Sequence, residues 1–283
     1  MDNVNPQQLT TWIETACLWE ASAPKVGNVH PGASFADLAY NDFVRSSRIV
    51  AFMLSRISQR GVADSILAAA SAVRLQVGKN TSLGIILLIA PLAAARVRGE
   101  IAEHISTVID ELDVSASSRI CQAIRTSKPG GMGTVEQQDL SAEPTVPVRE
   151  LMQLAAEKDL IARQYANNFH DLLTLGPDLI EKWMQNSTLD RSQQIVGMQL
   201  DWMSRYPDSL IDRKCGSEIA LEAQQRAKLI LEHGWPTQPE TAEELNQFDH
   251  WLRAEGNRRN PGTTADFIAA ILFLGLANGQ LTA

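Results

Sequence analysis

Helical periodicity is the feature that most constrains how this chain folds. Apolar residues recur three and four positions apart through most of the sequence, whereas sustained alternating runs of Val, Ile and Thr are missing. Ala, Leu, Gln and Glu, which favour helices, are abundant. The pattern therefore predicts an all-α protein. The expected helices cover residues 7–22, 42–58, 62–75, 83–98, 101–112, 115–126, 151–169, 190–205, 217–233, 242–255 and 263–276.

The chain has 283 residues, of which 45% are hydrophobic and 20% are charged, so it can bury a sizeable core. This length suits one large domain or two small ones. Residues 127–147 are rich in Gly, Pro and Ser and lack periodicity. They indicate a domain divider, a plain connector, or a lid that closes through Gly130–Gly133. Because the polar motifs on both sides look like parts of one site, we predict a single multi-helix globular domain over residues 1–283.

Net charge and cysteine content narrow the class of protein. The net charge of −8 and the isoelectric point near 5.2 give no support for nucleic-acid binding, although local amides and a few basic side chains suffice for a phosphate ligand. Cys17, Cys121 and Cys215 are widely spaced and odd in number, which fits a reduced, cytoplasmic chain. The N-terminus shows no signal peptide, and the apolar run 83–95 is short and contains Pro91, so we expect no membrane segment.

Four stretches carry more polar residues, Gly and Pro than a plain helical bundle needs. They read ASAPKVGNVHPGASFAD at 21–37, GKNTSLGI at 78–85, AAEKDLIARQYANNF at 155–169 and GNRRNPGTTADFIAA at 256–270. The third places Asp159, Arg163 and Asn167 on one face of a predicted helix. The second is not a Walker A loop, because Asn80 stands where Ser or Thr should be.

The second and fourth stretches each open a predicted helix with Gly and hydroxyl side chains. A helix N-terminus offers free N–H groups and a partial positive charge, Gly lets a ligand approach the backbone, and Thr hydroxyls add donors. Together these groups suit a phosphate oxygen, with Lys79 and either Arg258 or Arg259 as countercharge. Asp159 and Asp266 would suit Mg²⁺ on the same phosphates, because Mg²⁺ prefers oxygen ligands.

Each of these residues also has a purely structural interpretation. Asn80 and the threonines would serve equally as helix caps. Asp159 and Arg163 would serve equally as a surface ion pair, His30 as a loop histidine, and Asp266 as a partner of the helix dipole. The five histidines show no zinc-binding spacing, and no GxSxG or catalytic-cysteine motif occurs.

Five blocks of the sequence carry a resemblance to a known family. They are SAPKVGNVHP at 22–31, GKNTSLGIILLIAPLA at 78–93, EKDLIARQYANNF at 157–169, PDSLIDRKCG at 207–216 and NPGTTADFIAA at 260–270. Together, and in this order, they resemble the triphosphoribosyl-dephospho-CoA synthase family over nearly the whole chain. There are two departures. Val26 stands where the family often has Pro, and the last block differs from the Gly-Ser-Ala-Asp form of the citrate-lyase branch.

The resemblance implies an all-helical enzyme that moves the triphosphoribosyl group of ATP to the 2′-hydroxyl of 3′-dephospho-CoA and releases adenine. The product would be the prosthetic-group precursor for the acyl carrier proteins of citrate lyase and malonate decarboxylase. In that chemistry the N-glycosidic bond breaks at C1′ of the ATP ribose, and the triphosphate must be held without being cleaved. We therefore expect a Mg²⁺-dependent cytoplasmic transferase that binds ATP. Its supply of apolar helices suggests a homodimer.

In this interpretation, loops and helix N-termini line one nucleotide pocket, and the residues take three roles. The candidate acid/base groups are Glu20, His30 and Asp37. The candidate Mg²⁺ ligands are Asp159 and Asp266. The expected contacts to nucleotide and phosphate are Lys25, Asn28, Lys79, Asn80, Thr81, Arg163, Asn260, Thr263 and Thr264.

Two alternatives stay open. The stretches PGASFADLAYNDFVRSS and PDSLIDRKCG resemble a branch of archaeal and methylotroph-type homologues. That branch implies a ribosyl or phosphoribosyl transferase with a different acceptor, for instance in synthesis of a tetrahydromethanopterin-type cofactor. The second alternative is a non-catalytic helical protein that binds nucleotide and regulates a partner. The joint presence of Lys25, Lys79, Asp159 and Asp266 argues against it, because a scaffold needs none of them.

Overall fold

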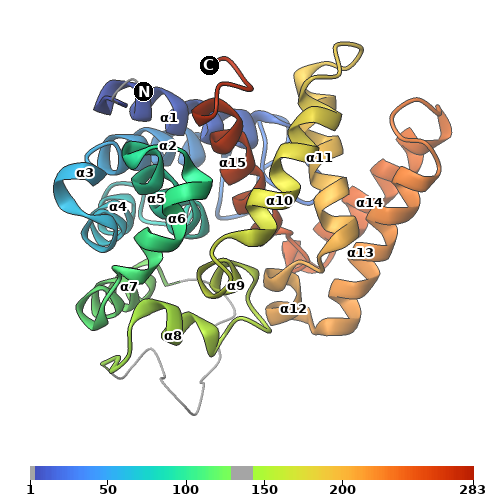
Figure 1. Ribbon diagram of the computed structural model, residues 1–283. Helices are drawn as coiled ribbons and strands as arrows, with labels where there is room; N and C mark the ends of the chain where they lie inside the picture. The colour runs from blue at the N-terminus through green and yellow to red at the C-terminus, as the bar shows by residue number, and fades with distance from the viewer. Residues whose placement is uncertain (1–3, 129–142) are drawn as a thin grey trace.

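The computed structural model describes residues 4–128 and 143–283 (Figure 1). Within these ranges the regular structure is helical, apart from an isolated antiparallel bridge between His30 and Ala33. The predicted all-α fold is confirmed. The elements are α1 (Pro6–Ser22), α2 (Tyr40–Leu54), α3 (Ile57–Arg60), α4 (Val62–Val77), α5 (Leu83–Arg98), α6 (Ile101–Asp110), α7 (Val114–Ser127), α8 (Val148–Gln153), α9 (Leu160–Ala166), α10 (His170–Leu179), the π-helical turn η1 (Ile180–Met184), α11 (Arg191–Arg205), α12 (Ser209–Cys215), α13 (Ser217–Glu232), α14 (Glu240–Asn257) and α15 (Gly262–Ala277).

The centre of the molecule is a parallel pair of helices, α5 and α15. Residues 83–95 of α5 are all buried, and so is most of α15, as expected for helices that are apolar on every side. Their N-terminal ends meet where the Ile85 N–H donates to Asp266 at 3.1 Å. Their C-terminal ends meet where Arg96 donates to the carbonyl of Ala277 at 2.9 Å. The two helices therefore bring both N-termini to the same end of the core.

The described residues form two hydrophobic clusters, and the carboxylates described below lie where they meet. The larger cluster includes α5 and α15 together with the surrounding helices α1, α2, α4, α6 and α10. The smaller one lies among α11–α14, which occupy the right of Figure 1, and includes Leu200, Ile211, Ala223 and Phe248. Val26, in the loop between α1 and α2, belongs to the smaller cluster. That loop therefore connects the two parts of the core.

The prediction of one helix over residues 151–169 is wrong. The structure has α8 and α9 there, separated by turns at 154–158. Asp159 ends the interruption, because its Oδ1 accepts from the N–H groups of Ile161 (2.9 Å) and Ala162 (3.1 Å) as an N-cap. Asp159, Arg163 and Asn167 therefore do not line one face of a long helix. Arg163 lies in the short helix α9, and Asp159 and Asn167 are its N-cap and C-cap.

Other boundaries also differ from the sequence pattern. The helix expected over 42–58 ends at Leu54, and α3 follows as a separate turn. Helices α10 and α12 and the turn η1 were not predicted. Most of the predicted loop 127–147, including Gly130–Gly133, lies outside the described residues, so its role as a lid or connector stays a prediction. On its C-terminal side the segment is anchored, since the Ser117 hydroxyl donates to the carbonyl of Val146 at 2.8 Å and Val148 donates its N–H to the carbonyl of Leu112 at 3.1 Å.

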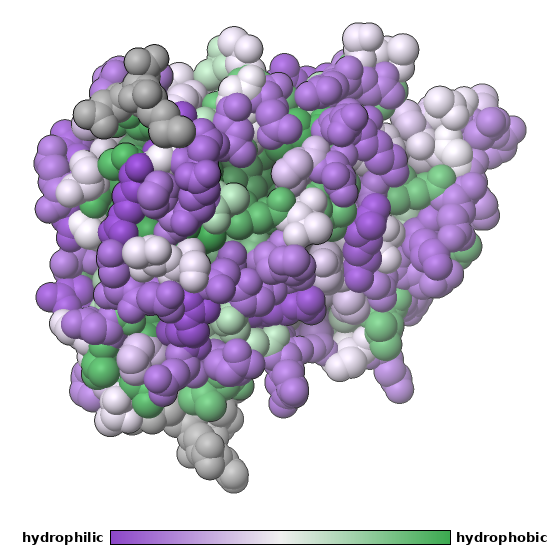
Figure 2. All heavy atoms as spheres, in the orientation of Figure 1, coloured by the Kyte–Doolittle hydropathy of each residue, from purple (hydrophilic) through white to green (hydrophobic). Residues whose placement is uncertain are grey.

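Hydrophilic side chains cover most of the face in Figure 2, and apolar residues show mainly in its upper middle. Isolated exposed apolar residues such as Phe52 and Leu75 are ordinary on a protein surface. None of the helices in the two described ranges is both long enough and apolar enough to cross a membrane.

Candidate active site

Four carboxylates from distant segments gather at the N-terminal end of the central helix pair. Glu20 lies near the end of α1, Asp159 precedes α9, Asp208 precedes α12, and Asp266 lies in the second turn of α15. Burial raises the pKa of Asp266 well above its ordinary value, and the charges of Glu20, Asp208 and Asp159 raise it further. We call these four residues the carboxylate cluster. Such mutual repulsion is typical of sites that meet a cation or hold a proton.

Asp208 connects two helices through one buried side chain. Its Oδ1 accepts from the N–H groups of Leu210 (2.9 Å) and Ile211 (3.1 Å) at the start of α12. Its Oδ2 accepts from both the N–H (2.7 Å) and the hydroxyl (2.8 Å) of Thr264 at the start of α15. Burial raises the pKa of Asp208, and these hydrogen bonds oppose that rise. The helix start predicted to bind phosphate thus already holds a carboxylate of the protein.

Asp266 makes the corresponding contact with α5. Its Oδ1 accepts the Ile85 N–H at 3.1 Å, and the carboxylate lies directly against Gly84. A Cβ atom at position 84 would overlap the Asp266 carboxylate, so only Gly leaves it room. Whereas Asp208 is fully buried, Asp266 remains partly exposed. Asp266 is therefore the cluster carboxylate that combines enclosure by protein with access to solvent.

Glu20 forms a buried ion pair with Lys25. The Nζ of Lys25 lies 2.7 Å from Glu20 Oε1 and also donates to the carbonyl of Glu20, and both side chains are almost completely buried. We predicted that Lys25 contacts phosphate. Its complete burial and its pairing with Glu20 argue against direct contact with a phosphate. Lys25 instead compensates the charge of Glu20 inside the protein.

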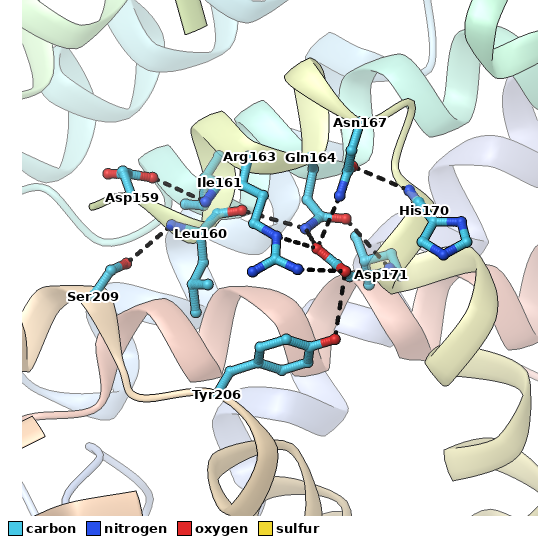
Figure 3. A network of polar contacts seen from close by, with 11 residues as sticks. Asp159, Leu160, Ile161, Arg163, Gln164, Asn167, His170, Asp171, Tyr206 and Ser209 are labelled. Carbon is cyan, nitrogen blue, oxygen red and sulfur yellow. Dashed lines mark hydrogen bonds and ion pairs between the residues drawn. The ribbon is translucent and has the colours of Figure 1, made fainter. Parts of the chain in front are cut away.

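Asp159 and Arg163 do not pair with each other, contrary to the surface-pair interpretation. Asp159 Oδ2 lies 2.8 Å from the guanidinium of Arg213 on α12. Arg163 forms an ion pair with Asp171 at 2.9 Å and 3.1 Å, and Gln164, Asn167 and Tyr206 also donate to that carboxylate, as Figure 3 shows. Asp171 therefore organises the α9–α10 corner, while Asp159 faces α12.

Asn28 anchors the loop between α1 and α2 to the start of α15. Its amide donates to Asn260 Oδ1 at 2.8 Å, and its own Oδ1 accepts from Gln199 of α11 at 3.1 Å. These contacts place Asn28 and Asn260 together, as their common assignment to one pocket requires. Asn28 is nearly buried, so its polar groups stabilise the loop.

The two other acid/base candidates lie further along this loop. His30 Nδ1 accepts the Gly32 N–H at 3.2 Å, and the pKa of His30 is lowered by burial and by the nearby Arg253. The neutral imidazole is therefore favoured. Asp37 is exposed and acts electrostatically on Lys214. Of the three acid/base candidates, Glu20 is the one whose charge is prominent at Asp266.

Comparison with known proteins identifies the family. A family model described as ATP:dephospho-CoA triphosphoribosyl transferase (CitG) matches residues 6–282. The chain belongs to this transferase family. The crystal structure of an Archaeoglobus fulgidus protein, described as a triphosphoribosyl-dephospho-CoA synthase, is similar with a TM-score of 0.63. The two are 22% identical, and the match covers 83% of this chain and 99% of the other, which supports the shared helical fold. No curated protein matches the chain.

In this member of the transferase family, the GKNTSLGI stretch has its polar groups engaged with the protein. Lys79 lies 2.7 Å from Asp42, and Asn80 Oδ1 accepts from the Leu83 N–H at 3.3 Å, although the N-cap position of α5 belongs to Ser82, which makes no side-chain cap bond. Thr81 is buried, and its hydroxyl lies 2.5 Å from that of Ser46. Of the predicted phosphate contacts here, Asn80 is exposed, Lys79 is half-buried and Thr81 is buried.

The NPGTTADF stretch is engaged in the same way. The Thr263 hydroxyl accepts from Ser209 at 3.1 Å, and Thr264 donates twice to Asp208. Neither threonine caps α15, whose N-cap residue is Pro261 and makes no side-chain bond. Asp208, from another segment, instead accepts the free N–H of Thr264 in the first turn. Both threonines are buried, which argues against direct phosphate contacts.

Sequence reasoning missed Asp208, Arg213 and Gly84. Two of them could have been noticed in the sequence. Asp208 precedes Ser209 in PDSLIDRKCG, and Asp is a common N-cap residue. Gly84 is the Gly of TSLGI, at the start of a predicted helix. What the sequence does not show is that Asp208 reaches a helix more than 50 positions away.

A cavity of about 510 Å³ lies elsewhere, among α3–α7. Two exposed ion pairs border it, between Arg98 and Glu111 and between Arg119 and Asp64. None of the residues predicted for the site lines this cavity. It is separate from the carboxylate cluster.

Proposed function

We propose that the carboxylate cluster is the active site at which the triphosphoribosyl group of ATP is transferred to 3′-dephospho-CoA. The observation that carries the proposal is the convergence of Glu20, Asp159 and Asp208 on Asp266 in a chain of this transferase family. The product would serve as a prosthetic-group precursor for an acyl carrier protein. The homodimer and the cytoplasmic location stay predictions.

The reaction exchanges one bond at C1′ of the ATP ribose for another. The C1′–N9 bond breaks and a C1′–O bond to the 2′-hydroxyl of the acceptor forms. The hydroxyl proton leaves, and adenine departs after it has gained a proton. Positive charge builds up on the sugar in between, and nearby carboxylates stabilise it. The cluster supplies this negative charge without needing to move.

Asp266 is the group we assign to proton transfer. Its raised pKa lets it hold a proton nearer neutral pH than an ordinary carboxyl does, and its partial exposure lets substrate reach it. Glu20 stays paired with Lys25 and contributes to the field around Asp266. Asp208 holds the starts of α12 and α15 in place.

Mg²⁺ fits the donor chemistry of this site. Bound to the triphosphate, it would neutralise part of the phosphate charge. Within the described residues no three His, Cys, Asp or Glu side chains are arranged as a complete metal site. That agrees with the usual mode of Mg²⁺ binding, in which one or two carboxylates act together with waters and substrate phosphates. Asp159 would hold the ion, and Asp266 would add an oxygen ligand after it has given up its proton, because only an ionised carboxylate binds Mg²⁺.

The test is to incubate purified protein with ATP, Mg²⁺ and 3′-dephospho-CoA and to separate the products by chromatography. We expect free adenine and a heavier CoA adduct in equal amounts. Asp266→Ala should abolish both, whereas Asp64→Asn, which changes an exposed carboxylate paired with Arg119, should leave both intact. Adenine without adduct would indicate a different acceptor. ATP binding without adenine release would overturn the proposed reaction.

A further inference from the structure

Several basic side chains of the described segments near the carboxylate cluster are tied to partners. Lys25 pairs with Glu20, Arg213 with Asp159, and Arg163 with Asp171. Arg258 donates to the carbonyl of residue 214 at 2.9 Å. The ammonium of Lys214, in the last turn of α12, makes no hydrogen bond or ion pair with any residue in the described ranges.

Lys214 lies in the last turn of α12, the short helix whose first turn is capped by the cluster residue Asp208. The charge of Asp208 acts on it from the start of its own helix, and the charge of Asp37 acts on it from the loop. Arg258 fixes the backbone of Lys214 from the segment before α15. Because three segments meet around it, the lysine is about half-buried.

An unpaired, half-buried ammonium has an energetic cost that an exposed lysine does not have. Burial lowers the pKa of Lys214, as expected when a charge loses water without gaining a direct partner. Such groups occur more often at binding sites than on ordinary surfaces. Lys158, which precedes Asp159, is by contrast fully exposed and needs no partner.

We propose that Lys214 binds a phosphate group of a nucleotide substrate at the edge of the carboxylate cluster. The inference rests on the proposed function, in which both substrates carry phosphates next to four carboxylates. A cation without a protein partner suits that place, and Lys214 is half-buried and makes no hydrogen bond or ion pair with a described residue. A lysine suits a phosphate as a compact point charge with three donors. The same chemistry fits the triphosphate of ATP and the pyrophosphate of dephospho-CoA, and experiment separates them.

The test compares Lys214→Met, Lys214→Gln and Lys214→Arg with the matched control Lys158→Met. Adenine release gives KM for each substrate and kcat, and calorimetry gives the Kd of ATP and of dephospho-CoA without any turnover. We expect the Met and Gln variants to weaken binding of one substrate by roughly 10- to 100-fold, with Arg less affected. Weaker ATP binding assigns the lysine to the triphosphate, and weaker dephospho-CoA binding assigns it to the acceptor.

The outcomes distinguish this inference from the proposed function. If Lys214→Met and Lys214→Gln both fold and bind both substrates as Lys158→Met does, the inference is overturned while the transfer reaction stands. If the wild type binds both substrates but releases no adenine, the reaction is wrong, and the calorimetric comparison still decides the role of Lys214. Inorganic triphosphate provides a further probe. It should compete with ATP less well in Lys214→Met if the triphosphate is the ligand.

Discussion

At the scale of single residues, the site depends on close contact between Gly84 and Asp266. The carboxylate occupies the space that a side chain at position 84 would need, while it accepts the Ile85 N–H. A Gly inside a helix usually lowers stability relative to Ala, so its presence here needs a packing reason. The Asp266 carboxylate is that reason.

Gly84→Ala should therefore displace Asp266 and lower the rate of adenine release at least tenfold, with a loss of about 1–3 kcal/mol in unfolding free energy. The control is Gly176→Ala in α10, where an added Cβ would meet its nearest neighbour at an ordinary 3.5 Å. We expect normal activity in that variant. Equal activity of the two variants in the chromatographic assay would contradict the role of Gly84.

Asp266→Asn should separate stability from activity. The pKa of Asp266 is higher in the folded than in the unfolded protein. The folded state is therefore most stable below the unfolded-state pKa, where the carboxyl group is protonated in both states. That stability is lost as the pH rises through the folded-state pKa and the buried group ionises. A neutral amide avoids that loss. Urea unfolding at neutral pH should show the variant more stable by about 1–3 kcal/mol, with the difference vanishing near pH 4, while adenine release is lost. A variant less stable than the wild type at neutral pH would refute the predicted repulsion.

At the scale of elements, short helices held by single carboxylates build the site. Helix α12 has only seven residues and could not persist alone. Asp208 stabilises it and links it to α15, and Asp159 links α9 to α12 through Arg213. Sequence periodicity does not predict these helices, because they are too short for an apolar pattern to repeat.

Asp208→Ala should accordingly remove the caps of two helices at once. We expect urea unfolding to show a loss of about 2–4 kcal/mol in unfolding free energy. Both helices would lose a cap, and the buried N–H and hydroxyl donors would be left without an acceptor. Asp113→Ala is the matched control, because Asp113 caps α7 alone through the Ala116 N–H at 2.8 Å. That variant should lose about 1 kcal/mol. Similar losses in the two variants would show that Asp208 does not join α12 to α15.

The sequence predicts elements well where apolar periodicity is long and poorly where polar contacts decide. The expected 83–98 and 263–276 helices agree closely with α5 and α15, which are buried on all sides. The expected 151–169 helix fails, because the N-cap at Asp159 outweighs a continuous apolar face. Several predicted phosphate contacts, such as Thr81 and Thr264, instead contact protein groups, and single-sequence reasoning cannot find those distant partners.

At the scale of the whole molecule, the site joins the two hydrophobic clusters. The loop between α1 and α2 packs Val26 against the smaller cluster, while α1, which carries Glu20, packs Ile13 and Cys17 in the larger one. A ligand at the carboxylate cluster should therefore stabilise both parts together.

Binding of ATP with Mg²⁺ should be visible in the thermal unfolding of the intact protein. We expect a single transition whose midpoint rises by several degrees with ATP and Mg²⁺ together, and by less with ATP alone. In Asp266→Ala the additional rise from Mg²⁺ should disappear, while Asp64→Asn should retain it. An equal rise with and without Mg²⁺ in the wild type would argue against a metal at Asp266.

The parallel arrangement of α5 and α15 also has a consequence for synthesis of the chain. Helix α5 leaves the ribosome long before α15, yet each needs the other to cover its apolar surface. Until residues 262–277 have emerged, α5 has an uncovered face, and Asp266 is not yet present to meet Gly84. The nascent chain therefore depends on protection from aggregation until translation has passed α15.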